Sequence, residues 1–143
     1  MPKTIIVTGT PATGKTMFSK NLGHKYVDLT KVIKENELYE SFDKKRDCLV
    51  VNEKKLRKYL VRMIKESKEK LVIDGHLSHY IPKSYVEKCY VMKCDISILK
   101  KRLEKRKYFK EKVNENIESE IVDVCLNEAL EKGHNVEIVN TTH

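Results

Sequence analysis

A glycine-rich segment near the start of the chain constrains the possible folds more than any other feature. Residues 9–16 read GTPATGKT and match the pattern GxxxxGK(S/T) at every fixed position. An apolar, β-branched run at residues 5–8 precedes the segment, and a stretch compatible with a helix follows at residues 16–22. Two glycines allow a turn whose backbone N–H groups point inward at the amino end of a helix, where they attract anions. The sequence therefore predicts a strand, a phosphate-binding loop and a helix, in that order.

The side chains of this loop suit a nucleoside triphosphate with a bound metal ion. Lys15 offers a positive charge to the β- and γ-phosphates, and the Thr16 hydroxyl is a ligand for Mg²⁺. We therefore expect ATP and Mg²⁺ as cofactors. The expected nucleotide contacts in this segment are Gly9, Pro11, Ala12, Thr13, Gly14, Lys15, Thr16 and Met17. The alternative is an ordinary glycine-rich turn between a strand and a helix.

A second apolar run, LVID at residues 71–74, ends in an aspartate. An apolar strand that ends in aspartate beside a phosphate loop is the Walker B pattern, in which the carboxylate holds Mg²⁺ directly or through water. We therefore expect Asp74 to be associated with the metal. Because aspartate often ends strands, a purely structural role is the alternative.

The rest of the chain alternates strand-like apolar runs with amphipathic stretches of helical period. The further expected strands are residues 26–29, 71–74, 89–93 and 136–139. The further expected helices are residues 31–36, 53–68, 96–107 and 113–132, the first two N-capped by Thr30 and Asn52. Residues 37–50 have no lasting period and are expected to form a long loop. This alternation predicts an α/β fold with a parallel sheet covered on both faces.

Length and composition narrow the class of protein. A chain of 143 residues suits one domain, because a single core typically serves roughly 100–200 residues. No apolar run approaches the ~18–20 residues of a membrane span, and the first residues are too short for a secretory signal, so we expect a cytoplasmic protein. A total of 29 Lys and Arg against 21 Asp and Glu gives a net charge of +8. This surplus favours phosphate-rich partners such as nucleotides or RNA, although a densely charged solvated surface is the alternative.

Four segments together resemble one known family. They are GTPATGKT, ELYESFDKKRDCLVVNE at residues 37–53, IDGH at 73–76 and RLEKRKYFKEKVNENIESEI at 102–121. The chain resembles the atypical adenylate kinases that also act as small-ribosomal-subunit assembly factors, the CINAP-like family, and looks archaeal. The resemblance implies a P-loop NTPase fold with a five-stranded parallel sheet in one domain over residues 1–143. It also implies a monophosphate-binding cover at about 28–51 and a short lid at about 105–113.

The resemblance implies an activity and partners. The expected reaction transfers the γ-phosphate of ATP to AMP, with ATP hydrolysis as a side activity and a role in small-subunit maturation. The implied partners are a small-subunit ribosomal protein and pre-ribosomal RNA, with no membrane or DNA partner.

The resemblance also assigns roles to single residues. Arg102 and Arg106 would neutralise the transferring phosphate, and Arg106 is the better match to the lid arginine that contacts ATP. Their guanidinium groups suit the charge of that transition state, whereas a solvated helix face is the alternative. His76 would serve ATP hydrolysis, and residues around Asn135 would contact the adenine.

The monophosphate site departs from the usual pattern. Lys34 stands where adenylate kinases commonly place an arginine, and lysine gives charge without a bidentate fork. Arg46 lies in the same cover and is expected to compensate.

Two other function classes stay open. One is an assembly ATPase that hydrolyses ATP while it holds a ribosomal protein or RNA. The other is a basic RNA-binding module whose ATP site only switches its shape. Dependence of turnover on AMP separates the kinase from both.

Overall fold

Five parallel strands form the central sheet of the computed structural model, which describes residues 3–44 and 48–141. The strands are β1 (Thr4–Gly9), β2 (Lys25–Asp28), β5 (Leu71–Asp74), β6 (Val86–Lys93) and β7 (Val136–Asn140). They lie in the order β2-β5-β1-β6-β7, and every neighbouring pair is parallel. The five-stranded parallel sheet expected from the sequence is confirmed. The phosphate-loop strand β1 is central, so the loop that follows it leaves the middle of the sheet.

Helices cover both faces of this sheet, as predicted. On β1, Ile5 and Val7 pack with Phe18, whose helix α1 (Lys15–Lys20) covers one face. Ile6 points the opposite way into a cluster with Leu56 and other residues of the second face. Alternate residues of a strand point to opposite faces, so a strand buried on both sides reads as a continuous apolar run.

Helix α3 (Glu53–Glu66) supplies much of the second face. Asn52 caps the helix as predicted, since its Oδ1 accepts the backbone N–H of Lys55 at 3.0 Å. Leu56, Leu60 and Ile64 are four residues apart and are at most 1% exposed. Burial of each such side chain stabilises the fold by ~1.5–3 kcal/mol.

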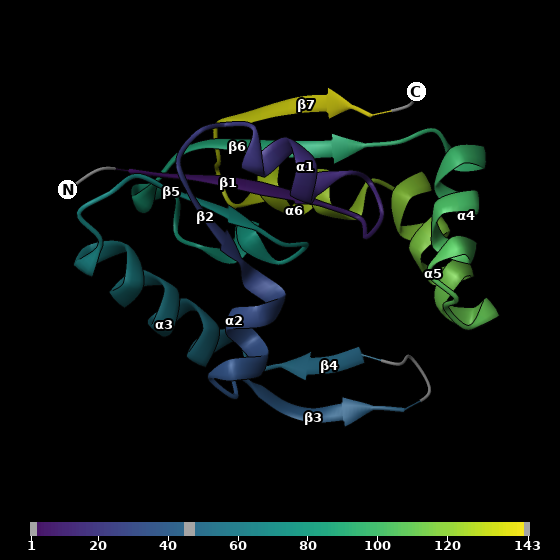
Figure 1. Ribbon diagram of the computed structural model, residues 1–143, viewed down its shortest axis with the longest axis horizontal. Coiled ribbons are helices and arrows are strands. Elements are labelled where there is room, and N and C mark those ends of the chain that lie inside the picture. Colours follow the sequence, from purple (N-terminus) through teal and green to yellow (C-terminus); the bar gives the residue numbers. More distant parts are fainter. Residues whose placement is uncertain (1–2, 45–47, 142–143) are drawn as a thin grey trace.

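The segment between β2 and α3 is more ordered than predicted. Helix α2 (Leu29–Glu35) is capped by Asp28 instead of Thr30, because Asp28 Oδ1 accepts the N–H of Lys31 at 3.3 Å. The expectation of a long loop over residues 37–50 is wrong. This segment forms an antiparallel hairpin of β3 (Tyr39–Asp43) and β4 (Cys48–Val51), which stands apart from the main sheet in Figure 1.

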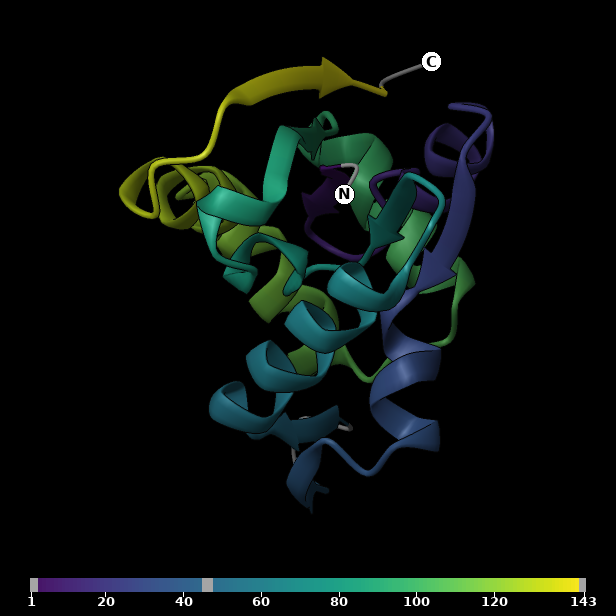
Figure 2. The same ribbon diagram turned by 90° about the vertical axis from the view of Figure 1, so that its left-hand side faces the viewer.

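The expected single helix over residues 113–132 is also wrong. Helix α5 (Lys110–Ile121) ends, and α6 (Val124–Glu131) begins after Asp123, which is left-handed with φ 54°. Lys93 pairs with both Asp123 and Glu120, and these contacts hold the break. Helices α4 (Ile96–Lys105) and α5 lie beyond the carboxyl ends of β6 and β7 (Figure 1). Figure 2 shows the same molecule turned by 90° about the vertical axis.

Two short 3₁₀ turns, Ser78–Tyr80 and Lys83–Tyr85, connect β5 to β6. Within the described parts of the chain, no helix has the length and apolar character needed to cross a bilayer.

Candidate nucleotide-binding site

The phosphate loop begins where β1 ends and requires glycine at both ends. Gly9 has φ 144° and Gly14 has φ 89°, values that favour glycine. A Cβ atom on Gly9 would lie 2.8 Å from the carbonyl oxygen of Met92, which is closer than such atoms approach. Inside the loop, the hydroxyl of Thr13 donates to the carbonyl oxygen of Thr10 at 2.6 Å. The loop is therefore held in one shape by its own contacts and by β6.

Lys15 lies folded back over the loop. Its Nζ donates to the carbonyl oxygens of Gly9 at 3.0 Å and of Thr10 at 3.1 Å. Burial of the ammonium lowers the pKa of Lys15 to about 8, and the nearby negative charge of Asp74 partly opposes this shift. An anion in the loop would replace the carbonyl oxygens as the partner of this charge.

Asp74 lies beside the loop at the end of β5, as the Walker B pattern predicts. It is 5% exposed, and its Oδ2 accepts the phenol of Tyr26 at 2.7 Å. Burial and then the hydrogen bond to Asp74 raise the pKa of Tyr26, while the Thr16 hydroxyl, as a donor to the phenol oxygen, opposes this shift. The Thr16 hydroxyl and the Asp74 carboxylate therefore meet at one phenol.

This pair of oxygen donors fits Mg²⁺. The ion prefers oxygen ligands and usually takes only one or two from the protein, with phosphate oxygens and water completing its shell. Residues 3–44 and 48–141 contain no group of three or more His, Cys, Asp or Glu placed to hold a metal by themselves. The magnesium expected at Thr16 and Asp74 would thus depend on the nucleotide phosphates.

His76 follows Asp74 by two residues and lines the cleft in front of Lys15. Its ring is open to the cleft. The protein around the ring removes water from it and so lowers the pKa of His76 to about 4, and the positive charge of Lys15 adds to this shift. The carbonyl oxygen of His76 accepts the hydroxyl of Thr8 at 3.1 Å, which ties this turn to β1. The imidazole is therefore neutral at pH 7.

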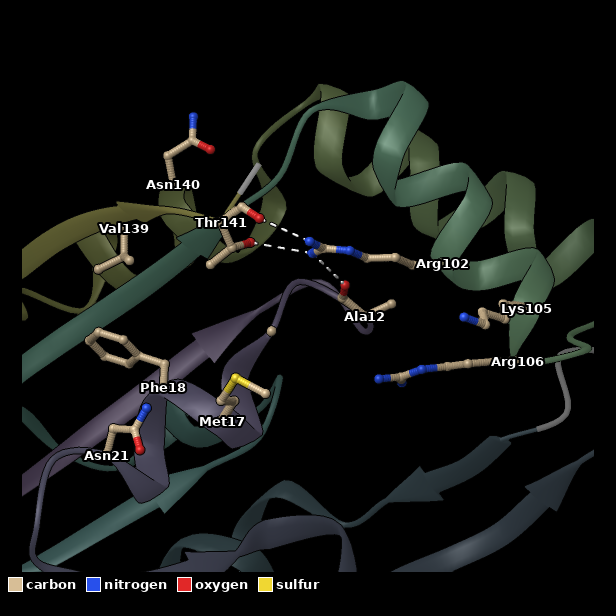
Figure 3. A pocket seen from close by; sticks show the side chains of 11 residues that line it. Ala12, Met17, Phe18, Asn21, Arg102, Lys105, Arg106, Val139, Asn140 and Thr141 are labelled. Atoms are coloured by element: carbon tan, nitrogen blue, oxygen red, sulfur yellow. Dashed lines mark hydrogen bonds between the residues drawn. The ribbon is translucent and has the colours of Figure 1, made fainter. Parts of the chain in front are cut away.

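The two arginines of α4 have different surroundings. Arg102 is half-buried and donates to the carbonyl oxygens of Ala12 at 3.3 Å and Thr141 at 2.9 Å. It thus joins the phosphate loop to the segment after β7 (Figure 3). Arg106 is exposed and extends toward the loop in Figure 3, and its guanidinium donates to the hydroxyl of Tyr108 at 3.4 Å. Of the two, Arg106 has the guanidinium that can reach a phosphate without breaking the loop's own contacts.

Two cavities meet at the phosphate loop. The first, of about 640 Å³, lies between α1, α4 and the end of β7 and is shown in Figure 3. The second, of about 1120 Å³, runs from the loop past Asp74 and His76 to the β3–β4 hairpin. Both are lined by Arg106, and they share loop residues Ala12 and Gly14 and also Met17. The phosphate loop therefore lies between the two cavities, and both cavities reach Arg106.

The structure brings most of the predicted residues together. The ones that line these cavities are Pro11, Ala12, Gly14, Lys15, Thr16, Met17, Lys34, Asp74, His76, Arg102 and Arg106. Asn135 is not among them, because it lies at the amino end of β7, where its carbonyl oxygen accepts the N–H of Cys89. The first cavity lies at the opposite end of that strand, and the expected contact of Asn135 with the adenine stays a prediction. Arg46 lies outside the described residues.

Three residues of the site were missed from the sequence. Tyr26 binds Asp74, Thr141 accepts from Arg102, and Glu120 accepts from the phosphate loop. Glu120 alone carries a usable signal. It stands seven residues after Val113 and three after Ile117, a spacing that places a carboxylate on the buried face of α5.

Comparisons with known proteins agree with this geometry. A family model described as "AAA domain" matches residues 5–123. A protein of Methanocaldococcus jannaschii named "Putative adenylate kinase" is 40% identical over 140 residues, which cover 95% of this chain and 77% of that protein. The "Adenylate kinase isoenzyme 6 homolog" of Dictyostelium discoideum is 34% identical over 130 residues, covering 87% and 73% of the two chains.

A solved structure shares the fold at low identity. A shikimate kinase from Bacteroides thetaiotaomicron superposes with a TM-score of 0.55 at 18% identity, covering 96% of this chain and 86% of that one. This likeness shows the P-loop NTPase fold alone. The two relatives match at higher identity over most of their own lengths, and the chain belongs to the atypical adenylate kinase family that includes them.

Proposed function

We propose that the protein is a nucleoside monophosphate kinase that transfers the γ-phosphate of ATP to AMP and forms two ADP. The observation that carries this proposal is the position of the phosphate loop between two cavities that share Arg106. A kinase of this type needs a donor nucleotide and an acceptor nucleotide on either side of one transferring phosphate. The names of the two relatives support the same reaction.

The proposed chemistry follows from the charges around the loop. An oxygen of the AMP phosphate attacks the γ-phosphorus, the bond from that phosphorus to the β–γ bridging oxygen breaks, and the bridging oxygen leaves on ADP. Lys15 and Arg106 would bind the phosphate oxygens, whose charge is spread in the transition state. Mg²⁺ held at Thr16 and Asp74 would supply further neutralisation of phosphate charge. The acceptor oxygen is already ionised at neutral pH, so no protein base is required.

The acceptor would lie in the larger cavity. Lys34 on α2 lines this cavity and offers the charge expected to meet the monophosphate. Phe42 and Leu49 of the β3–β4 hairpin line it as well and give an apolar surface for a base. The segments at about 28–51 and 105–113 are proposed to move as cover and lid, which excludes water during transfer.

A second candidate activity is ATP hydrolysis, and His76 favours it. The neutral imidazole lies in the cleft near Lys15, where it can orient a water molecule on the γ-phosphate. By family resemblance, this activity would serve maturation of the small ribosomal subunit in the cytoplasm. A small-subunit ribosomal protein and pre-ribosomal RNA are the proposed partners, and the net charge of +8 suits an RNA surface.

A coupled assay for ADP with and without AMP tests the proposal. We expect ADP formation from ATP to rise many-fold when AMP is added, with two ADP formed per ATP consumed. An ADP rate that does not respond to AMP, or to any other monophosphate, would reject the kinase and favour the assembly ATPase.

A further inference from the structure

Glu120 on α5 is a buried carboxylate placed directly behind the phosphate loop. It is 5% exposed, and its Oε1 accepts the hydroxyl of Thr10 at 2.9 Å. Its Oε2 accepts the backbone N–H of Cys94 at 2.9 Å, and Lys93 Nζ lies 3.1 Å from Oε1. A buried carboxylate is costly unless it is paired and hydrogen-bonded, and this one has both kinds of partner.

Thr10 is the residue on which the loop's internal contacts converge. Its carbonyl oxygen accepts three donors, the Nζ of Lys15 and both the backbone N–H and the hydroxyl of Thr13. Its own hydroxyl donates outward to Glu120. The position of Thr10 therefore fixes the carbonyl oxygen on which Lys15 rests, and Glu120 is the contact that fixes its side chain.

Helix α5 joins this contact to the nucleotide cleft. Lys112, Glu115 and Asn116 in its first two turns line the larger cavity, and Glu120 lies at its carboxyl-terminal end. The left-handed Asp123 ends the helix there, so that its carboxylate also pairs with Lys93. The carboxyl-terminal end of α5 is thus anchored to β6 through Lys93 and to the loop through Thr10.

We infer that Glu120 is a positioning residue that holds Thr10, and through it the phosphate loop, in the shape that binds ATP. The inference rests on the ATP site of the proposed function. Glu120 touches neither nucleotide in this assignment and acts through Thr10.

The test compares ATP binding and kinetics in four variants. Glu120→Gln keeps the size of the side chain, but places N–H groups against donors. Thr10→Val removes only the hydroxyl, and Thr10→Ser restores it. Glu118→Gln makes the same chemical change two residues away on an exposed part of α5 and is the matched control. Calorimetric titration gives the affinity for ATP with Mg²⁺, steady-state kinetics give KM for ATP and for AMP, and thermal unfolding checks the fold.

We expect Glu120→Gln and Thr10→Val each to weaken ATP binding about tenfold, with a matching rise in KM for ATP and little change in KM for AMP. The double variant should lose no more than either single one, because both remove one contact. Thr10→Ser should bind ATP more tightly than Thr10→Val, and Glu118→Gln should behave as the wild type.

Other results would overturn the inference in distinguishable ways. If Glu120→Gln folds and binds ATP as the wild type does, Glu120 does not position the loop. If KM for ATP and for AMP rise together with a lowered melting temperature, Glu120 only stabilises the fold. If Glu120→Gln does not fold, the two Thr10 variants decide between these outcomes. Failure of the wild type itself to bind ATP would reject the proposed function along with this role.

Discussion

The phenol of Tyr26 donates a hydrogen bond to Oδ2 of Asp74 at 2.7 Å, across the neighbouring parallel strands β2 and β5. Tyr26 stands opposite Val72, two residues before Asp74, so its long side chain reaches along the sheet to the carboxylate. The contact fixes Oδ2 of Asp74, the residue proposed to hold Mg²⁺, and the other carboxylate oxygen, Oδ1, is not engaged by this phenol. The orientation of the metal site therefore depends on a residue of the adjacent strand.

Replacement of Tyr26 by phenylalanine tests this dependence. The change leaves an oxygen of a buried carboxylate without its donor, which should lower the free energy of unfolding by about 1–3 kcal/mol. It should also raise the Mg²⁺ concentration that gives half-maximal turnover, because the freed carboxylate is less well oriented. Urea unfolding and a Mg²⁺ titration of the rate measure the two effects. Tyr90→Phe is the matched control, since within the described residues the Tyr90 hydroxyl has no hydrogen bond; an equal effect there would contradict the role of Tyr26.

Lys15 should be needed for ATP use and dispensable for folding. Among the described residues, its ammonium donates hydrogen bonds to two backbone carbonyl oxygens of the loop, those of Gly9 and Thr10. Removal in Lys15→Ala deletes a charge-assisted contact to phosphate of ~1.5–3 kcal/mol before any effect on the transition state. We expect undetectable turnover, with thermal unfolding close to that of the wild type. Lys101→Ala, which removes an exposed lysine of α4, should retain activity; full activity in Lys15→Ala would reject the phosphate-loop assignment.

Much of the fold was predictable because its signals are local. The runs at 71–74 and 53–68 bury consecutive or regularly spaced apolar residues, and β5 and α3 form almost as expected. The phosphate loop was predictable because its glycines are required by the backbone itself. These features need only the residues in their own segments.

The errors occur where distant residues decide the structure. Residues 37–50 are highly charged and have no hydrophobic period, so the sequence did not indicate the hairpin. Its two strands form by pairing with each other. The helix break at Asp123 depends on Lys93, 30 residues away in the chain. Arg102 and Thr141 contact across 39 residues, so no local pattern indicates that Arg102 holds the loop.

Acid should destabilise the fold through two buried histidines. Burial lowers the pKa of His79, whose Nε2 lies 3.0 Å from Glu128, and burial likewise lowers the pKa of His134, whose Nε2 donates to the carbonyl oxygen of His79 at 2.7 Å. Lys132 adds a like charge near both rings, whereas Glu128 opposes the shift of His79. Below the ordinary histidine pKa of about 6.5, the unfolded chain binds protons that the folded chain does not.

The contribution of these two histidines to the free energy of unfolding should therefore be constant above pH 7 and fall as the pH drops below about 6.5. Urea unfolding at pH 7.5 and at pH 5 measures the difference. In His79→Asn the difference between the two pH values should shrink, although the variant is less stable at both. The exposed His24 provides the control, and His24→Asn should keep the wild-type difference. A stability that rises on acidification would contradict the neutral state of the buried rings.

His76 separates the kinase from the ATPase. AMP brings a phosphate oxygen that is already ionised at neutral pH, so transfer to AMP needs no proton acceptor. Water is a poorer nucleophile and must be oriented near the γ-phosphate by a side chain. The imidazole of His76 lies in the cleft, and its lowered pKa of about 4 keeps it neutral and able to accept a hydrogen bond from water at pH 7.

We therefore expect His76→Ala to lower ATP hydrolysis without AMP more than it lowers AMP phosphorylation. Both rates are measured in one preparation, so that differences in folded fraction cancel in their ratio. The ratio of hydrolysis to transfer should fall by ~10²-fold or more, within the ~10²–10⁴-fold range of positioned proton-transfer groups. His79→Asn changes a buried histidine three residues away and should lower the two rates in proportion. If the two rates of His76→Ala fall in parallel, or only the kinase rate falls, His76 does not orient water and the assembly-ATPase mechanism loses its main residue.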